Sequence, residues 1–311
     1  MKLIMQKMYC PFTIEAFNEY EKRIKKMDGI LPSTLCFESI LAWSKVCQPF
    51  YQIEADYLCI SVYDRNKKYM YMPIGSYSAE SLESLIDILY NDTPSRTNPL
   101  YFCDVAEQQL VYFKQLKKYH ISIQCDRGYS DYIYTMDDFE KSLNKTDSRY
   151  NERYFIRHYN PEIRIMSCTD GESCNTIIEK AFCCFHECSE CTNGCLKDTI
   201  DVLLKEWNNL NITGIIVSSN GEDIGYAAGT MLNDVFVFLF KKNCRKYRGL
   251  SEYLHRMLFE RLRGSTQFIN YTEDMNLDGL RKYKQCLAPY LLKPKYKLEI
   301  ERLDEYEKKD N

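Results

Sequence analysis

The chain has 311 residues, of which 45% are hydrophobic and 27% charged, and its formal net charge is −3. This length suits two domains of ordinary size, and this composition is typical of a globular protein with a hydrophobic core. The negative net charge excludes a generally basic surface, so we expect no DNA partner.

The distribution of apolar residues along the sequence predicts neither a membrane span nor a secretory signal. The N-terminus, MKLIMQKMYCPF, has no continuous apolar region followed by a small-residue cleavage site, so it does not predict a secretory signal. The longest apolar run, Val235–Phe240, is far shorter than a membrane span. Fifteen cysteines without an export signal indicate a reducing compartment. We therefore expect a cytoplasmic protein without a membrane span.

The N-terminal half predicts a hairpin followed by alternating helices and strands. The hairpin pairs Tyr57–Tyr63 with Tyr69–Ile74 around a polar turn. The elements expected next are a helix at Ala79–Tyr90, a strand at Leu100–Cys103, a helix at Ala106–Lys117 and a strand at His120–Cys125.

A polar stretch follows at Lys141–Asn151, rich in Asn, Ser, Asp and Lys, as is typical of a linker. We place the domain boundary there. The predicted domains are residues 1–145 and residues 146–311.

The C-terminal half repeats the order of the first. Asn220-Gly221 predicts a tight turn between two of its strands. The expected elements are a helix at Leu196–Leu210, strands at Gly214–Ser218, Ile224–Leu232 and Val235–Phe240, a helix at Leu250–Leu262, a strand at Gln267–Thr272, a helix at Leu277–Cys286 and an extended segment at Tyr290–Ile300. A repeated order without sequence identity indicates duplication. We therefore predict an α+β fold of two similar domains, each a mostly antiparallel sheet flanked by helices.

The loop after Val235–Phe240 resembles the pyrophosphate loop of the GNAT acyltransferases. In that family a basic residue or Gln, a Gly and a small residue lead into a helix whose N–H groups hold the pyrophosphate of acetyl-coenzyme A. The resemblance implies cofactor binding by Lys246, Arg248, Gly249 and Ser251. Lys246 departs from the usual Arg or Gln, and an ordinary turn before a helix is the alternative.

Four segments in a fixed order carry a second resemblance, which covers nearly the whole chain. They are Leu35–Trp43, Ser130–Tyr134, Ile269–Lys284, and Pro289 with Lys295-Tyr296. Together they resemble the C-terminal domain of phosphatidylglycerol lysyltransferases, which is similar to Fem-type aminoacyl transferases. The resemblance implies two tandem GNAT-like domains and transfer of an aminoacyl group from tRNA to an acceptor.

Two departures from that family limit what it implies. Members commonly carry a Lys/Arg-rich stretch after the central linker, whereas Ser148–Phe155 mixes basic, acidic and aromatic residues. The sequence alone therefore does not predict phosphate or tRNA contact there. This sequence contains no counterpart of the membrane half of the lysyltransferases, so we do not assume lipid lysylation.

The block that follows the strand Gln267–Thr272 supplies the candidate site. Acyl transfer needs a group that removes a proton from the acceptor, and Glu273 and Asp274 are the candidate catalytic carboxylates. Capping of the next helix, or a salt bridge with Arg281, is the alternative. Tyr271 is a candidate proton donor, although a place in the core is the stronger interpretation.

The same block supplies candidate substrate-binding residues, which are Asn270, Arg281, Lys282 and Lys284. The basic residues suit a phosphate, a tRNA backbone or a carboxylate, and their alternative is a solvated basic helix face. We also expect Arg281 and Asp274 to hold the carboxylate and the ammonium of an amino-acid-like group.

A cysteine cluster lies between Cys183 and Cys195, and it includes His186, Cys188 and Cys191. Its spacing offers enough thiolates for zinc. No second, distant pair of ligands accompanies it, so free thiols are the stronger interpretation and we assign no metal. The remaining histidines, His120, His158 and His255, have no accompanying ligand pattern and receive no role.

These observations favour an enzyme, an acyl- or aminoacyltransferase that moves its group from acyl-coenzyme A or aminoacyl-tRNA to an amine or hydroxyl. No resident cofactor is firmly indicated, and the expected partners are a small-molecule or aminoacyl-tRNA substrate. The alternative is a non-catalytic ligand-binding or regulatory protein on a lapsed GNAT scaffold. The sequence does not identify the donor, the acceptor or the oligomeric state.

Overall fold

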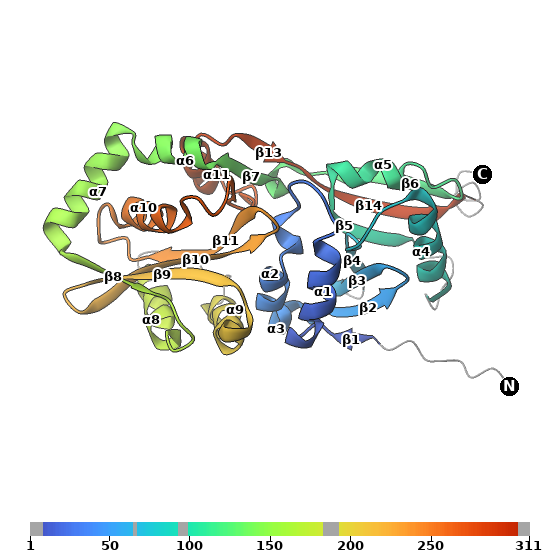
Figure 1. Ribbon diagram of the computed structural model, residues 1–311, viewed down its shortest axis with the longest axis horizontal. Coiled ribbons are helices and arrows are strands. Elements are labelled where there is room, and N and C mark those ends of the chain that lie inside the picture. The colour runs from blue at the N-terminus through green and yellow to red at the C-terminus, as the bar shows by residue number, and fades with distance from the viewer. Residues whose placement is uncertain (1–8, 65–66, 93–98, 183–192, 304–311) are drawn as a thin grey trace. The chain divides into compact units, whose positions relative to one another are not determined.

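The computed structural model describes residues 9–64, 67–92, 99–182 and 193–303, which form two compact units (Figure 1). Described residues within 1–40, 47–129 and 293–311 make the first unit, and those within 41–46 and 130–292 make the second. Among these residues, every helix is too short or too polar to cross a membrane.

The first unit is built on a seven-stranded sheet. Its strands, in spatial order, are β1 (Cys10–Pro11), β2 (Phe50–Glu54), β3 (Tyr57–Asp64), β4 (Lys67–Tyr71), β5 (Leu100–Ala106), β14 (Lys295–Arg302) and β6 (Tyr119–Cys125). β4 and β5 run parallel, and the other neighbours pair antiparallel. Its helices include α1 (Phe17–Ile24), α4 (Ala79–Asp92) and α5 (Leu110–Phe113), while α2 (Phe37–Ala42) and α3 (Ser44–Cys47) lie where the chain crosses between units.

The second unit contains another seven-stranded sheet. Its strands, in spatial order, are β13 (Leu291–Lys293), β7 (Asp131–Thr135), β12 (Phe268–Asn270), β11 (Val235–Asn243), β10 (Glu222–Leu232), β9 (Ile212–Ser219) and β8 (Pro161–Ile165). β11 and β12 run parallel, whereas the pairs from β8 to β11, and β12 with β7, are antiparallel. Its helices are α6 (Met136–Leu143), α7 (Thr146–Tyr159), α8 (Gly171–Phe182), α9 (Asn193–Glu206), α10 (Leu250–Leu262) and α11 (Asp278–Cys286).

Helices cover both faces of this second sheet, and each face has its own core (Figure 1). In β9, Ile215 and Val217 belong to the core shared with α6, α7 and α10. Ile216, between them, belongs to the core shared with α8 and α9. This two-sided alternation is what period-2 strand geometry requires when both faces are covered.

The predicted fold class is confirmed, because each unit is a mixed, mostly antiparallel sheet flanked by helices. The helix predicted at Leu250–Leu262 is α10, and the predicted helix at Ala106–Lys117 is the shorter α5 preceded by a 3₁₀ turn at Glu107–Gln109. The proposed division at residues 145/146 falls in the connection between α6 and α7, within the second unit. The chain passes from the first unit to the second between residues 129 and 130, and it returns to the first unit between residues 292 and 293.

A bulge in β11 brings its backbone close to a glycine of β10, which a substitution can test. The register between β10 and β11 shifts at Gly229, where a Cβ would lie 2.3 Å from the carbonyl oxygen of Val237 and 2.4 Å from the Phe236 ring. We expect Gly229→Ala to lower the free energy of unfolding by about 2 kcal/mol, because backbone and ring must shift. Urea denaturation measures this change.

Gly279→Ala is the matched control. Gly279 lies in α11 with nothing within 4 Å of its would-be Cβ. Alanine there should raise the free energy of unfolding by about 0.5–1 kcal/mol through helix propensity. A Gly229→Ala protein as stable as the wild type would contradict the packing described here.

Candidate functional site

The two parallel strands β11 and β12 pair for three residues and then separate. Paired residues join Val235–Val237 to Phe268–Asn270, and beyond them the two segments diverge. A pocket of about 330 Å³ lies between residues 238–242 and residues 271–275. The separation matters because strand ends that leave a ladder expose backbone and side chains to a ligand.

The segment that follows β12 has a strained backbone. Thr272, Met275 and Asn276 all adopt left-handed conformations, with φ of 56°, 52° and 59°. The left-handed region of φ/ψ space is unfavourable for a β-branched residue such as Thr272. Such backbone strain persists only where the surrounding structure enforces it. Strain of this kind concentrates at functional sites, which marks this wall of the pocket as a candidate.

A buried lysine enforces the conformation. Lys284 of α11 is only 2% exposed. Its ammonium donates to the carbonyl oxygen of Tyr271 and, at 2.7 Å, to that of Glu273. These bonds tie the strained segment to α11 and satisfy carbonyls that no longer belong to a ladder.

A network of polar side chains from three elements lies beside the pocket. The Lys241 ammonium of β11 donates to the hydroxyl of Tyr283 at 2.7 Å and to that of Ser251 at 2.8 Å. It also lies 3.0 Å from Nε2 of His255 in α10. The Tyr271 hydroxyl lies 2.7 Å from the same nitrogen. One ammonium therefore organises the hydroxyls and the imidazole.

His255 is a neutral imidazole in this network. Because an ammonium can only donate, Nε2 accepts from Lys241, and the ring proton belongs on Nδ1. Burial, followed by the positive charge of Lys241, lowers the pKa of His255 well below its ordinary value. Burial likewise raises the pKa of Tyr271 well above its ordinary value, so that hydroxyl keeps its proton.

The structure distributes the candidate residues of the 270–284 block over different environments. Glu273 and Lys284 line the pocket. Asn270 is buried behind it, where its side chain donates to Asp131 and accepts from the backbone of Thr272. Lys282 is exposed on α11.

Asp274 and Arg281 contact each other. Arg281 donates from Nε and Nη2 to the two carboxylate oxygens of Asp274, at 3.0 and 3.1 Å. The carboxylate, which is fully buried, also accepts from the hydroxyl of Tyr132 at 2.6 Å. The hydrogen bonds with Asp274 raise the pKa of Arg281. This is the ion pair that the sequence left open as an alternative, and a catalytic role for Asp274 stays a prediction.

The predicted pyrophosphate loop packs against α7. Gly249 has a φ of 87°, and a Cβ there would lie 2.0 Å from the carbonyl oxygen of Asn151. Arg248 donates to the Asn151 side chain at 3.0 Å. Lys246 lies 4.9 Å from the ring of Tyr247, and Ser251 belongs to the Lys241 network. Packing thus accounts for the glycine, and cofactor binding by this loop stays a prediction.

Sequence reasoning missed Lys241, His255 and Tyr283. Lys241 reads as the start of a basic loop, and His255 lies between the apolar residues of an amphipathic helix. One signal was present: Ser251 and His255 are four residues apart and share a helix face. Polar residues on an otherwise apolar helix face indicate a buried polar network.

The cysteine cluster lies largely outside the described residues, because residues 183–192 are not among them. Within the described part of the chain, no group of three or more His, Cys, Asp or Glu residues is arranged to hold a metal ion.

Comparison with known proteins identifies the same architecture elsewhere. The family model for the C-terminal part of phosphatidylglycerol lysyltransferase matches residues 32–299. A conserved protein of unknown function from Bacteroides thetaiotaomicron has a TM-score of 0.85 at 18% identity, covering 95% of this chain and 100% of that one. No curated protein sequence matches the chain.

Two further solved structures extend the likeness. L-PGS from Bacillus licheniformis has a TM-score of 0.63 at 13% identity, covering 91% of each chain. FemX has a TM-score of 0.64 at 9% identity, covering 94% of this chain and 97% of that one. These likenesses concern the fold, which is two GNAT-like units in tandem, as predicted.

The neutral state of His255 predicts how stability depends on pH. The unfolded chain carries an ordinary histidine, with a pKa of about 6.5. Below that pH, and above the lower pKa of the folded state, the unfolded chain binds one more proton than the folded chain. The free energy of unfolding therefore falls as the pH falls, by up to about 1.4 kcal/mol per pH unit from this group.

Urea denaturation between pH 7.5 and 5 measures the slope. His255→Asn should lose this component whatever its stability at pH 7.5, whereas His158→Asn, at an exposed histidine, should keep the wild-type slope. Equal slopes for the wild type and His255→Asn would contradict a neutral, buried His255.

Proposed function

Because the chain belongs to the family of phosphatidylglycerol lysyltransferase C-terminal domains, we propose that it is an aminoacyltransferase whose donor is aminoacyl-tRNA. The pocket between β11 and β12 receives the aminoacyl group in this proposal. A row of arginines on α7 contacts the phosphates of the RNA. That row is the observation that favours tRNA over a small thioester donor.

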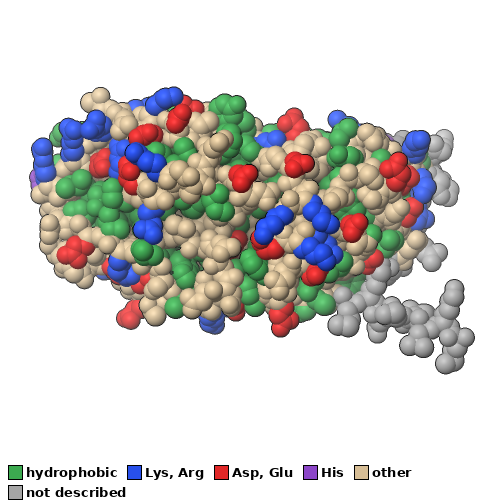
Figure 2. Space-filling view, in the orientation of Figure 1, with side chains coloured by type: hydrophobic (Ala, Val, Ile, Leu, Met, Phe, Trp, Pro, Cys, Tyr) green, Lys and Arg blue, Asp and Glu red, His purple; other side chains and the backbone are tan. Residues whose placement is uncertain are grey.

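Arg149, Arg153 and Arg157 recur every four residues along α7, so they share one face with a rise of about 6 Å between neighbours. All three are exposed, and no ion pair joins them to a carboxylate among the described residues. They line a groove of about 580 Å³ with Tyr150 and Tyr154. Basic side chains are visible in Figure 2 over the surface where Figure 1 places α7. Regularly spaced, unpaired arginines suit a sugar-phosphate backbone.

The acidic residue that interrupts this stretch in the sequence does not interrupt it in space. Glu152 is part-buried and pairs with Arg256 of α10 at 3.3 Å. Within residues 148–155, Glu152 therefore lies on the side of α7 that packs against α10, and the arginines lie on the exposed side. This separation supports phosphate contact at the place where the sequence did not predict it.

The packing of α7 also bears on the donor. Acetyl-coenzyme A in GNAT proteins needs free N–H groups at the start of the helix that corresponds to α10. Here the backbone of Asn151 lies against that start, and the side chain of Asn151 contacts both Arg248 and Glu252. A pyrophosphate has to displace these contacts, which favours the tRNA donor.

The pocket residues suit transfer from an ester. The acceptor amine or hydroxyl attacks the ester carbonyl and gives its proton to Glu273, which lines the pocket. The Tyr283 hydroxyl accepts from Lys241, and in this proposal its own proton stabilises the oxyanion. Collapse of the tetrahedral intermediate breaks the ester bond, and protonated Glu273 returns the proton to the departing ribose oxygen.

Binding of deacylated total tRNA, measured by filter binding at several salt concentrations, tests the donor. We expect Arg153→Ala to weaken binding about fivefold and to reduce the slope of log affinity against log salt by about one, because one phosphate contact is lost. Lys205→Ala, at an exposed lysine of α9 on the other side of the sheet, is the control and should bind like the wild type.

The same preparation is titrated with coenzyme A and acetyl-coenzyme A. Tighter binding of either than of tRNA, or wild-type tRNA binding by Arg153→Ala, Arg149→Ala and Arg157→Ala, would contradict the proposed donor.

A further inference from the structure

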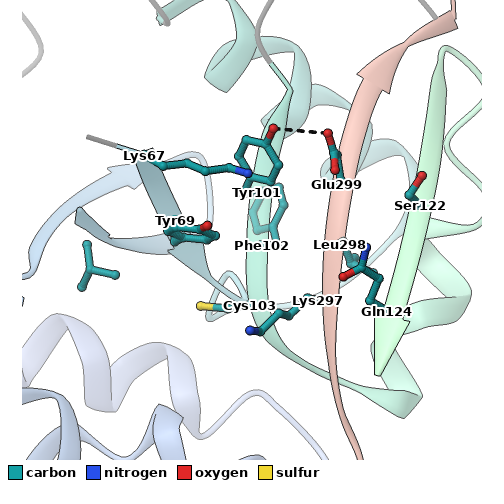
Figure 3. Close-up of a pocket in the computed structure, with 11 residues that line it drawn as sticks. Lys67, Tyr69, Tyr101, Phe102, Cys103, Ser122, Gln124, Lys297, Leu298 and Glu299 are labelled. Carbon is teal, nitrogen blue, oxygen red and sulfur yellow. Dashed lines mark hydrogen bonds between the residues drawn. The ribbon is translucent and has the colours of Figure 1, made fainter. Parts of the chain in front are cut away.

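A second pocket, of about 430 Å³, lies on the sheet of the first unit (Figure 3). Tyr69 of β4 lies opposite Tyr101 of β5, and Glu299 of β14 lies opposite Tyr101 on its other side. Ser122 of β6 in turn lies opposite Glu299. Cross-strand partners point to the same face of a sheet, so four strands contribute side chains to one surface.

The opposite face of these strands is the one that the helices cover. The ring of Phe102, next to Tyr101, contacts Phe113 of α5, with ring centroids 5.6 Å apart. Tyr90 of α4 donates to the carbonyl oxygen of Ile300. The pocket side carries polar and aromatic residues instead of a packed apolar core, as expected of a surface that meets a ligand.

Two lysines give the pocket positive charge. The Lys67 ammonium lies 3.3 Å from the centroid of the Tyr101 ring and 5.5 Å from that of Tyr69. Lys297 lies 5.3 Å from the Tyr129 ring. No ion pair joins either lysine to a carboxylate within the described residues. The rings orient the ammonium groups without neutralising them, which leaves both charges available to an anion.

The remaining side chains offer hydrogen-bonding groups of both kinds. Glu299 accepts from the Tyr101 hydroxyl at 3.2 Å through one carboxylate oxygen, which orients the other (Figure 3). Ser122 and Gln124 stand on the far side of β14, and each can donate and accept. The pocket thus combines cations, an oriented carboxylate, aromatic rings and neutral polar groups.

A nucleotide has a counterpart for each of these groups. Inorganic phosphate uses only the lysines, and an amino acid leaves the rings and the neutral polar groups unused. We propose that this pocket binds a nucleotide, with its phosphate on Lys67 and Lys297, its ribose hydroxyls on Glu299 and its base against the ring of Tyr69. The ligand is either a free nucleotide or a nucleotide within single-stranded RNA, since the two share this chemistry.

Isothermal titration calorimetry of the full chain with AMP, adenosine and inorganic phosphate tests the site. We expect AMP to bind more tightly than either fragment. Lys67→Met keeps the apolar stem but removes the charge, so it should weaken AMP about tenfold and leave adenosine nearly unchanged. Tyr69→Leu should weaken AMP and adenosine alike, because it removes stacking.

Lys114→Ala is the control, because Lys114 is an exposed lysine that follows α5 on the covered face. It should bind AMP like the wild type. If Lys67→Met does not fold, as judged by its thermal melt, Lys297→Met takes its place with the same expectation.

A five-nucleotide single-stranded RNA distinguishes the two sources of the ligand. Tighter binding of the RNA than of AMP assigns the pocket to RNA, and the reverse order assigns it to a free nucleotide. Absence of AMP and RNA binding at concentrations up to about 5 mM would overturn the proposal. So would an equal loss of AMP binding in Lys67→Met and Lys114→Ala.

Discussion

The ammonium of Lys284 is the contact on which the candidate site depends. Beyond the residues where β12 pairs with β11, the carbonyl oxygens of Tyr271 and Glu273 need other hydrogen-bond donors. The ammonium of Lys284 in α11 donates to both. A neutral or shorter side chain leaves these carbonyls unsatisfied and releases the left-handed backbone at Thr272. Lys284 thus ties α11 to the backbone of Glu273, and both residues line the pocket.

The hydrogen-bond network of Lys241 fixes the side chains on the β11 side of the pocket. Its ammonium is shared among Tyr283, Ser251 and His255, so strand β11 and helices α10 and α11 are held by one charge. Neutral His255 accepts a hydrogen bond from the Lys241 ammonium. A protonated imidazole could not accept it, because both of its ring nitrogens carry a proton. The two lysines thus do different work: Lys284 fixes the backbone that diverges, and Lys241 fixes the hydroxyls that face the space between the strands.

Local pattern predicted most elements of the second unit, because helix α10 and strands β9 to β11 carry periodicities that depend only on neighbouring residues. It did not predict strand partners. Residues 295–302 alternate as a strand, with Leu298 and Ile300 buried, yet nothing local indicates that β14 joins the first sheet between β5 and β6. The three buried residues Tyr132–Tyr134 predict a covered strand without revealing that β12 is the partner of β7. Pairing depends on tertiary contacts, which a single sequence does not display.

The candidate site shows the same limit. Glu273 and Lys284 were found because they lie in one continuous block, whereas Lys241, His255 and Tyr283 are brought together from separate elements by the fold. The pairing of Asp274 with Arg281 was open in sequence, since a carboxylate seven residues before an arginine suits a ligand site and a structural pair equally well. The fold shows that Asp274 is fully buried and paired with Arg281, and neither its burial nor this contact can be read from the sequence.

The most direct test of the proposed transferase compares the affinity of the protein for tRNA charged with a mixture of the twenty amino acids and for the same tRNA deacylated. In the proposed complex the α7 arginines contact both forms, so any difference in affinity reports on the pocket. We predict that the charged form binds about tenfold more tightly, and that Leu280→Trp, which fills the pocket, removes this preference while retaining affinity for deacylated tRNA. Equal affinities for the two forms in the wild-type protein would contradict an aminoacyl site between β11 and β12.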